Sequence, residues 1–273
     1  MATVTVRHPA VAGRFYPRNP DDLRAEVENY LRLSETAAPI KAIGCISPHA
    51  GYMFSGHVAG AVFARIEVPH RCFVLCPNHT GMGRQLAVMS EGAWGTPLGL
   101  VPVDHELAAA LRANFPALHD DFAAHRVEHA VEVELPFLQT RQPRLTFVPI
   151  ALGTRQFEVL DQLGRALAEV VAKQPDPILI VASSDMNHYQ SDAVTRAKDQ
   201  KAIERILSLD PAGLYEVVVQ QDISMCGLAP AVAMLTAARH LGAISAELVR
   251  YATSGDISGD RAMVVGYAGM VVS

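Results

Sequence analysis

Apolar and polar positions follow two different periods along this chain. In residues 20–33 (PDDLRAEVENYLRL) apolar positions recur every three to four residues, which predicts a helix with acidic residues in its first turn. The run 42–47 (AIGCIS) is short and almost continuously apolar, which is typical of a buried strand. The two patterns then alternate to the end of the chain, so we expect strands and helices in alternation.

The same reading extends to the rest of the chain. Further strands are expected at 72–77, 85–90, 99–104, 145–152 and 177–183. Further helices are expected at 55–67, 104–115, 129–139, 158–173, 193–209, 211–221 and 229–242. Local signals predict Ser55 as a helix N-cap, a turn at Trp94 and Gly95, and a helix stop near Pro136. The chain closes with two strand-like runs, 246–253 and 261–272, which predict an antiparallel pair.

This order of elements predicts an α/β fold. Apolar strands that alternate with helices favour a three-layer sandwich, in which helices cover both faces of a mixed, mostly parallel central sheet. The sequence contains no repeats, low-complexity tracts or linker-like stretches. Its 273 residues fit one large domain, so we expect a single domain over 1–273.

Composition excludes several classes of protein. Half of the residues are hydrophobic and 19% are charged, which argues against a disordered chain. The formal charge of −5 provides no global basic field, so neither nucleic acid nor an anionic membrane is expected as a partner. The N-terminal stretch lacks a signal-peptide pattern, and no apolar run reaches the roughly 18 residues needed to span a bilayer. We expect a cytoplasmic protein.

Histidines follow three of the expected buried strands. The strand-end sequences are Pro48-His49-Ala50-Gly51-Tyr52, Asn78-His79-Thr80-Gly81 and Ser184-Asp185-Met186-Asn187-His188-Tyr189. In open α/β sheets, ligands bind beyond the carboxyl ends of the strands. The sequence therefore predicts a cluster of imidazoles and one carboxylate at a single edge of the sheet.

Two neutral imidazoles and one anionic ligand are typical of a transition-metal site with open coordination positions. The residues leave two candidates for the anionic ligand, Asp185 and Cys226. A carboxylate is typical of non-haem Fe(II) oxygenases, and a thiolate suits iron, zinc or copper. The other cysteines, Cys45, Cys72 and Cys76, lie in apolar strand runs, and we expect them to be core residues.

A second polar cluster spans residues 128–134 (EHAVEVE). His129 and Glu132 are three residues apart and would share a helix face. There they would orient the metal ligands without binding the metal themselves. The alternative is a solvated helix start with acidic residues near its N-terminus. The remaining histidines have no chemical partners in the sequence. They are His8, His57, His70, His105, His119, His125 and His240.

Seven stretches of this chain resemble a known family. PAVAGRFYP, SPHAGYMFSG, CPNHTG, EGAWGTPLG, EHAVEVELPFLQ, SSDMNHY and MCGLAP are similar, in this order, to the signature stretches of the Memo-like proteins. These proteins are also called AmmeMemoRadiSam system protein B. The family is similar in fold to the LigB-type class III extradiol dioxygenases, which open catechol rings with non-haem Fe(II).

The resemblance implies roles for individual residues. It places the metal ligands on His49, His79 and Cys226, and it aligns His188 with the acid–base histidine of the dioxygenases, with Asp185 as its partner. It implies peptide contacts at Phe15 and Tyr16, and Tyr52 and Trp94 are further aromatic candidates for lining a groove. The family name also implies a radical-SAM protein and an AMMECR-type protein as partners.

Three hypotheses follow. The first is a redox enzyme related to dioxygenases, with Fe(II) as the expected ion and copper as an alternative. The second is a non-catalytic binding or scaffold component of a modification system, with a peptide or small molecule in the cleft. The third is a zinc hydrolase that uses the same ligands.

Overall fold

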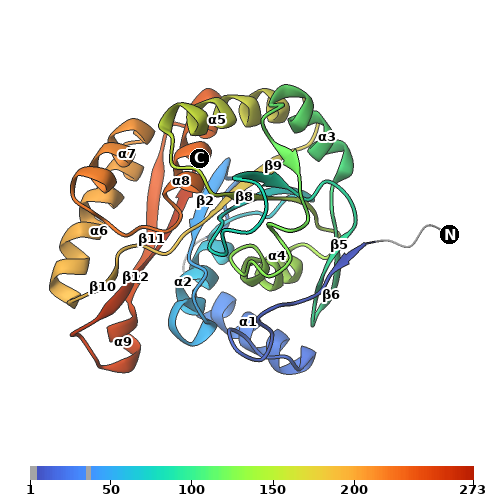
Figure 1. The fold of residues 1–273 in the computed structure, drawn as a ribbon. Helices are drawn as coiled ribbons and strands as arrows, with labels where there is room; N and C mark the ends of the chain where they lie inside the picture. The colour runs from blue at the N-terminus through green and yellow to red at the C-terminus, as the bar shows by residue number, and fades with distance from the viewer. Residues whose placement is uncertain (1–4, 35–37) are drawn as a thin grey trace.

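The computed structural model describes residues 5–34 and 38–273, whose strands form two sheets (Figure 1). The strands of the larger sheet are β2 (Gly44–Ser47), β3 (Arg71–Pro77), β4 (Leu86–Val88), β7 (His119–Asp120), β8 (Thr146–Leu152), β9 (Ile178–Ser183), β10 (His188–Gln190), β11 (Ala246–Thr253) and β12 (Val264–Val272). The strands of the smaller sheet are β1 (Val6–Arg7), β5 (Ala93–Thr96) and β6 (Gly99–Pro102).

The four central strands of the larger sheet are parallel, and β12 and β4 on either side of them pair antiparallel with β2 and β8. The strand order is β10-β12-β2-β9-β3-β8-β4-β7, and β11 pairs with β12. The neighbours β2, β9, β3 and β8 run parallel to one another. The expected antiparallel pair at the end of the chain is confirmed, because β11 runs against β12, which in turn runs against β2.

Helices cover both faces of this sheet, as predicted. They are α1 (Pro20–Leu33), α2 (Tyr52–Arg65), α3 (His105–Asn114), α4 (Leu135–Arg141), α5 (Phe157–Ala172), α6 (Asp192–Leu207), α7 (Pro211–Gln220), α8 (Leu228–His240) and the short α9 (Ser254–Ser258). The helices α1, α2 and α4 lie on one face, while α3, α5 and α8 lie on the other (Figure 1).

The strand residues alternate between two hydrophobic cores, one on each face. In β3, Cys72 and Cys76 point into the core beneath α1, α2 and α4, whereas Phe73 and Leu75 point into the core beneath α5 and α8. Period-two alternation requires this division. Cys45, Cys72 and Cys76 are free, fully buried thiols, which confirms the prediction that they are core residues.

The start of α2 corrects one local prediction. The helix begins at Tyr52 with Gly51 as N-cap, so Ser55 lies inside its first turn. The Ser55 hydroxyl donates a hydrogen bond to the Ala50 carbonyl oxygen at 3.0 Å instead of accepting one from the backbone. A short polar side chain within a helix can bond backward in this way, which makes it resemble a cap in sequence.

Two further local predictions were wrong. Trp94 and Gly95 lie inside β5, so the turn falls after Thr96, and β4 and β6 belong to different sheets. Pro136 lies in the first turn of α4, which a short 3-10 helix, η1 (Glu132–Glu134), precedes. Proline is tolerated in a first turn because the N–H that it lacks would have no partner there.

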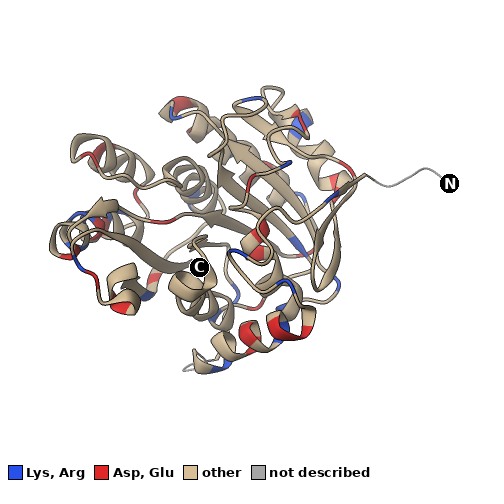
Figure 2. Ribbon diagram, turned by 60° about the horizontal axis from the view of Figure 1, so that its bottom comes forward, with Lys and Arg blue, Asp and Glu red and all other residues tan. Residues whose placement is uncertain are grey.

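Charged residues are mixed by sign over the ribbon, with Lys and Arg interspersed among Asp and Glu in the view of Figure 2. Within the part of the chain that the structure describes, every helix is too short or too polar to cross a membrane.

Candidate metal centre

Three adjacent parallel strands deliver polar residues to one edge of the sheet. The neighbours β2, β9 and β3 end at Ser47, Ser183 and Pro77. His49, Asp185 and His79 each stand two residues beyond those ends. This arrangement confirms the expected convergence at the carboxyl edge, which follows from the parallel pairing of the strands.

The imidazoles of His49, His79 and His129 form a compact group. The His79 and His129 rings stack with centroids 4.8 Å apart, and the His49 ring lies 5.1 Å from His79 and 5.5 Å from His129. One donor nitrogen from each residue lies within 4.8 Å of the other two, a geometry that can hold a metal ion. His129 reaches this histidine group from the loop before η1.

Protein groups occupy the Nδ1 atoms of three site histidines. His49 Nδ1 lies 2.7 Å from the Ser183 hydroxyl, and His79 Nδ1 lies 2.9 Å from a Glu128 carboxylate oxygen. His188 Nδ1 lies 2.9 Å from the Ser224 carbonyl oxygen, which can only accept. A ring whose Nδ1 carries the proton presents an unprotonated Nε2, which is the form that binds a metal.

Cys226 and Asp185 flank His49. The Cys226 sulfur lies 3.2 Å from His49 Nε2, and the Asp185 backbone N–H donates to the sulfur at 3.3 Å. The Asp185 carboxylate accepts the His49 backbone N–H at 2.8 Å. The loop of Cys226 approaches closely because Gly227 has no side chain: a Cβ there would lie 2.2 Å from the Ser184 Cβ.

The electrostatics of the site differ between its imidazoles. Burial opposes the protonation of His79, but the hydrogen bond and the charge of Glu128 raise the pKa of that ring above its ordinary value. Burial, followed by the charges of His79, His129 and His188, lowers the pKa of His49 well below its ordinary value. Burial raises the pKa of Asp185 to about 7 and also raises the pKa of the Cys226 thiol. A divalent cation stabilises both the carboxylate and the thiolate, and neutral imidazole is its usual nitrogen ligand. The donor set therefore fits a transition-metal ion.

Glu128 is a site residue that the sequence reading missed. Its buried carboxylate accepts the His79 backbone N–H at 2.7 Å as well as bonding the His79 ring, and it lies 3.4 Å from His129 Nδ1. Helical spacing pointed to Glu132 as the partner of His129, but residues 128–131 precede the helical turn. The only available signal was the presence of an acid directly before His129.

Comparison with known proteins identifies the family of this chain. A family model described as Memo-like protein matches residues 7–271. The chain belongs to the Memo-like family. A MEMO1 family protein of Methanopyrus kandleri is 42% identical, with 97% of this chain and 98% of that protein covered. A MEMO1 family protein of Aquifex aeolicus is also 42% identical, with 97% and 98% covered.

A solved structure supports the fold. The chain is similar to an uncharacterized protein from Escherichia coli K12, with a TM-score of 0.58 over 85% of this chain and all of that chain. The two sequences are 13% identical, so this likeness concerns the fold alone.

The four aromatic residues proposed for a Memo-like groove occupy different surroundings. Phe15 is half-buried and meets the His129 ring edge-on, with centroids 4.9 Å apart. Tyr16 and Tyr52 are buried, and their hydroxyls donate to Glu132 and to the Val133 carbonyl oxygen. Trp94 is fully buried beneath the Arg7 guanidinium. Of the four, Phe15 is the residue whose ring contacts the histidine group.

Glu132 binds the N-terminal segment. Its carboxylate accepts hydrogen bonds from the backbone N–H groups of Ala10 and Val11 and from the Tyr16 hydroxyl, and it forms an ion pair with Arg7. This carboxylate therefore fixes the N-terminal segment that carries Phe15 beside the histidine group.

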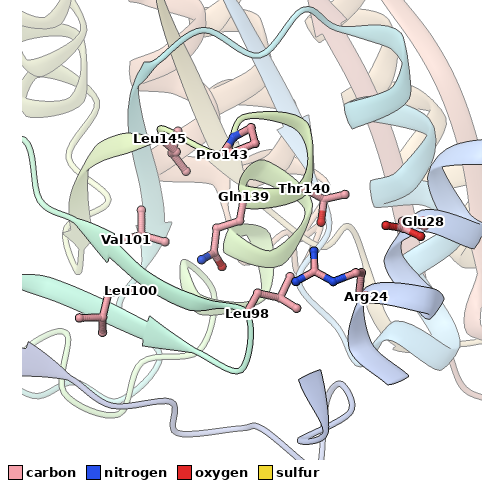
Figure 3. A pocket seen from close by; sticks show the side chains of 9 residues that line it. All are labelled: Arg24, Glu28, Leu98, Leu100, Val101, Gln139, Thr140, Pro143 and Leu145. Atoms are coloured by element: carbon pink, nitrogen blue, oxygen red, sulfur yellow. The ribbon is translucent and has the colours of Figure 1, made fainter. Parts of the chain in front are cut away.

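A separate cavity lies away from this chemistry. Figure 3 shows it between α1, the β5–β6 hairpin and α4, with Arg24 and Glu28 on one side and Leu98 and Leu100 on the other. Its volume is about 320 Å³, and its lining residues include no imidazole or thiol. This cavity therefore offers no imidazole or thiol ligand for a metal ion.

Proposed function

We propose that this Memo-like protein binds Fe(II) on His49, His79 and Cys226 and uses it for redox chemistry of the dioxygenase type. The observation that carries the proposal is the engagement of Nδ1 in both histidines by Ser183 and Glu128, which leaves Nε2 of each ring as the atom available to a metal. Cys226 lies beside His49 Nε2, where a thiolate ligand is needed. Cysteine ligates only as a thiolate, so the proposal expects a reducing compartment such as the cytoplasm.

The residues around the ion would have separate tasks. When bound, Fe(II) would supply coordination positions for O₂ and a bidentate substrate. Asp185 orients the backbone of His49 through the bond to its N–H. His188 is partly exposed and keeps Nδ1 on the Ser224 carbonyl, so its Nε2 is the atom that would exchange protons with substrate.

A zinc hydrolase is the second candidate, and the position of His129 favours it. Three histidines form the protein ligands of some catalytic zinc sites, in which a bound water completes the coordination. His49, His79 and His129 provide three such nitrogens within 4.8 Å of one another. The two candidates differ in their third ligand, which is Cys226 for iron and His129 for zinc.

Elemental analysis after anaerobic purification distinguishes these candidates. Iron that is lost in Cys226→Ala and retained in His129→Ala supports the first. Zinc that is lost in His129→Ala and retained in Cys226→Ala supports the second. Cys72→Ala is the matched control, because the Cys72 thiol, which lies in β3, is buried in a hydrophobic core. Metal content that is unchanged in a His49→Ala, His79→Ala double variant would overturn both.

Oxygen uptake tests the reaction itself. Ring-opening dioxygenation inserts both atoms of O₂ into a catechol as one ring carbon–carbon bond breaks, so it needs no external reductant. We expect uptake with at least one catechol when the protein is loaded with Fe(II), and loss of uptake in His188→Gln. No uptake with any member of a catechol panel would contradict the dioxygenase assignment.

Binding partners form a separate part of the proposal. Phe15 at the edge of the histidine group would offer a contact for a peptide or a small ligand. We expect a radical-SAM protein and an AMMECR-type protein to co-purify with this chain. Retention of both by the His49→Ala and Cys226→Ala variants would show that this binding does not need the metal, as the scaffold hypothesis requires.

A further inference from the structure

Glu128 makes more contacts with the histidine group than any other carboxylate described above. One oxygen, Oε2, accepts the His79 backbone N–H at 2.7 Å. The other, Oε1, lies 2.9 Å from His79 Nδ1 and accepts the backbone N–H groups of His129 and Ala130 at 2.9 and 3.0 Å. A single side chain thus joins the loop after β3 to the loop that carries His129.

This carboxylate is fully buried, a location that ordinarily opposes its ionisation. Both of its oxygens accept hydrogen bonds from backbone N–H groups, those of His79, His129 and Ala130, which compensate the burial of the carboxylate. The Arg7 guanidinium donates to the Glu128 carbonyl oxygen at 2.6 Å and fixes the backbone behind the carboxylate. The burial of an ionised group at this position therefore has compensating contacts on both sides.

Hydrogen bonding fixes the direction of the His79 ring. A carboxylate oxygen can only accept, so the 2.9 Å contact places a proton on Nδ1, and in the neutral ring Nε2 is then the unprotonated nitrogen. The bond to the His79 backbone N–H restrains the residue at a second point, which limits rotation of the ring. An oriented ring with a defined tautomer is a stronger metal ligand than a free one.

We propose that Glu128 is a positioning residue, which holds His79 as its Nδ1–H tautomer and sets the backbone of His129 beside it. The tautomer follows from the protein alone. Its effect on metal affinity rests on the metal site proposed above. The proposal is independent of which ion is bound and of whether the protein is catalytic.

Nitrogen NMR of the metal-free protein tests the tautomer directly. At a pH high enough for the ring to be neutral, we expect wild-type His79 to carry its proton on Nδ1. In Glu128→Ala no acceptor faces Nδ1, so the Nδ1–H form loses its preference and the Nε2–H form gains population. In Glu128→Asp the charge remains, and the Nδ1–H form is partly restored. A neutral wild-type His79 ring with its proton on Nε2 overturns the proposal, even if Glu128→Ala fails to fold, and so does an unchanged tautomer in Glu128→Ala.

Metal affinity provides the second readout. Loss of a hydrogen-bond partner behind a ligating histidine typically costs about 10–100-fold in affinity, so we expect Co²⁺ to bind that much more weakly to Glu128→Ala. Glu128→Asp should recover part of the loss. Equal affinity in wild type and Glu128→Ala would overturn the positioning role, whereas no Co²⁺ binding to wild type would overturn the metal site and leave the tautomer result standing.

Asp104→Ala is the matched control. Asp104 is also a buried carboxylate, and it binds Arg71 at the opposite end of β3 from His79, with contacts of 2.6 and 2.9 Å. We expect this variant to lose stability while its His79 tautomer and Co²⁺ affinity match those of wild type. A loss of affinity equal to that of Glu128→Ala would show a general effect of destabilisation and would contradict the proposal.

Discussion

Two networks of ionic side chains differ sharply in burial. Arg7 and Glu132 pair beside the metal centre, and both side chains are 0% exposed. Arg196 and Arg261 pair with Asp192 and Asp256 where α6 meets α9, and the two arginine side chains are 37% and 58% exposed. Similar chemical groups thus act in a water-free setting in one network and at the protein surface in the other. Because water and salt screen the second network, we expect the first to dominate stability.

In the buried network, every side-chain nitrogen and oxygen of Arg7 and Glu132 has a partner. Arg7 also donates to the His125 and Glu128 carbonyl oxygens, at 3.1 and 2.6 Å, and its guanidinium lies 4.4 Å from the Trp94 ring centroid. These contacts join the N-terminal segment to the loop that carries Glu128 and His129. The network therefore supports the candidate metal centre, whereas the surface network lies on the α6–α9 side of the molecule.

The largest expected effect is from removal of one buried charge. Arg7→Met leaves the Glu132 carboxylate buried without its cation, which should lower the free energy of unfolding by about 3–5 kcal/mol. Urea denaturation measures this loss. The double variant Arg7→Met, Glu132→Gln removes both charges, keeps an acceptor for the N-terminal segment and should recover part of the stability. A single variant within about 1 kcal/mol of wild type would contradict the importance assigned to this ion pair.

The second prediction concerns His125, the buried neighbour of Arg7. Burial and the Arg7 charge lower the pKa of His125 from 6.5 to about 4, so the folded protein keeps this ring neutral. In the unfolded chain the His125 ring binds a proton near pH 6.5, whereas in the folded protein it stays neutral until the pH is near 4. Stability should therefore fall as the pH decreases from 6.5 toward 4, by up to about 3 kcal/mol.

His125→Phe tests that dependence because it keeps a ring against Trp94 and removes the titrating group. The difference in unfolding free energy between variant and wild type should change across this pH range. A constant difference would show that His125 does not carry the acid sensitivity.

Sequence reasoning located the site more reliably than its supporting contacts. The strand-end histidines were predicted because parallel strands bring their carboxyl ends to one edge, whatever the details of the loops. Glu128 was missed because its contacts depend on an irregular loop, where helical spacing does not apply. The tendency of Trp94 and Gly95 to form a turn was overridden by strand pairing, since β5 pairs with both β1 and β6.

Arg7 shows a second limit of sequence reasoning. An arginine in a short N-terminal strand has the sequence appearance of a surface residue. Its burial depends on Glu132, which stands 125 residues away along the chain. No local sequence pattern predicts such a distant partner. The contribution of the N-terminal segment to the site was therefore visible only in the structure.

The third prediction concerns acid sensitivity of the surface network. The hydrogen bonds from Arg196 and Thr253, at 2.9 and 2.6 Å, lower the pKa of Asp192 to about 2. A lowered carboxyl pKa stabilises the fold above the ordinary value near 4, and that stability is lost as the pH falls from 4 toward 2. Asp192→Asn should remove this dependence and lower stability at neutral pH by on the order of 1 kcal/mol. Acid titration separates it from His125, whose window lies above pH 4.

The smallest effect is expected for Arg261→Ala. Its guanidinium contacts Asp192 and Asp256 at 2.8 and 3.2 Å, but it is more than half exposed. We expect a loss below about 1 kcal/mol at low salt, and almost none at about 1 M NaCl, where charges are screened within about 3 Å. Arg7→Met should show the same loss at both salt concentrations, because no solvent reaches its ion pair. Equal salt dependence of the two variants would mean that burial does not distinguish the networks.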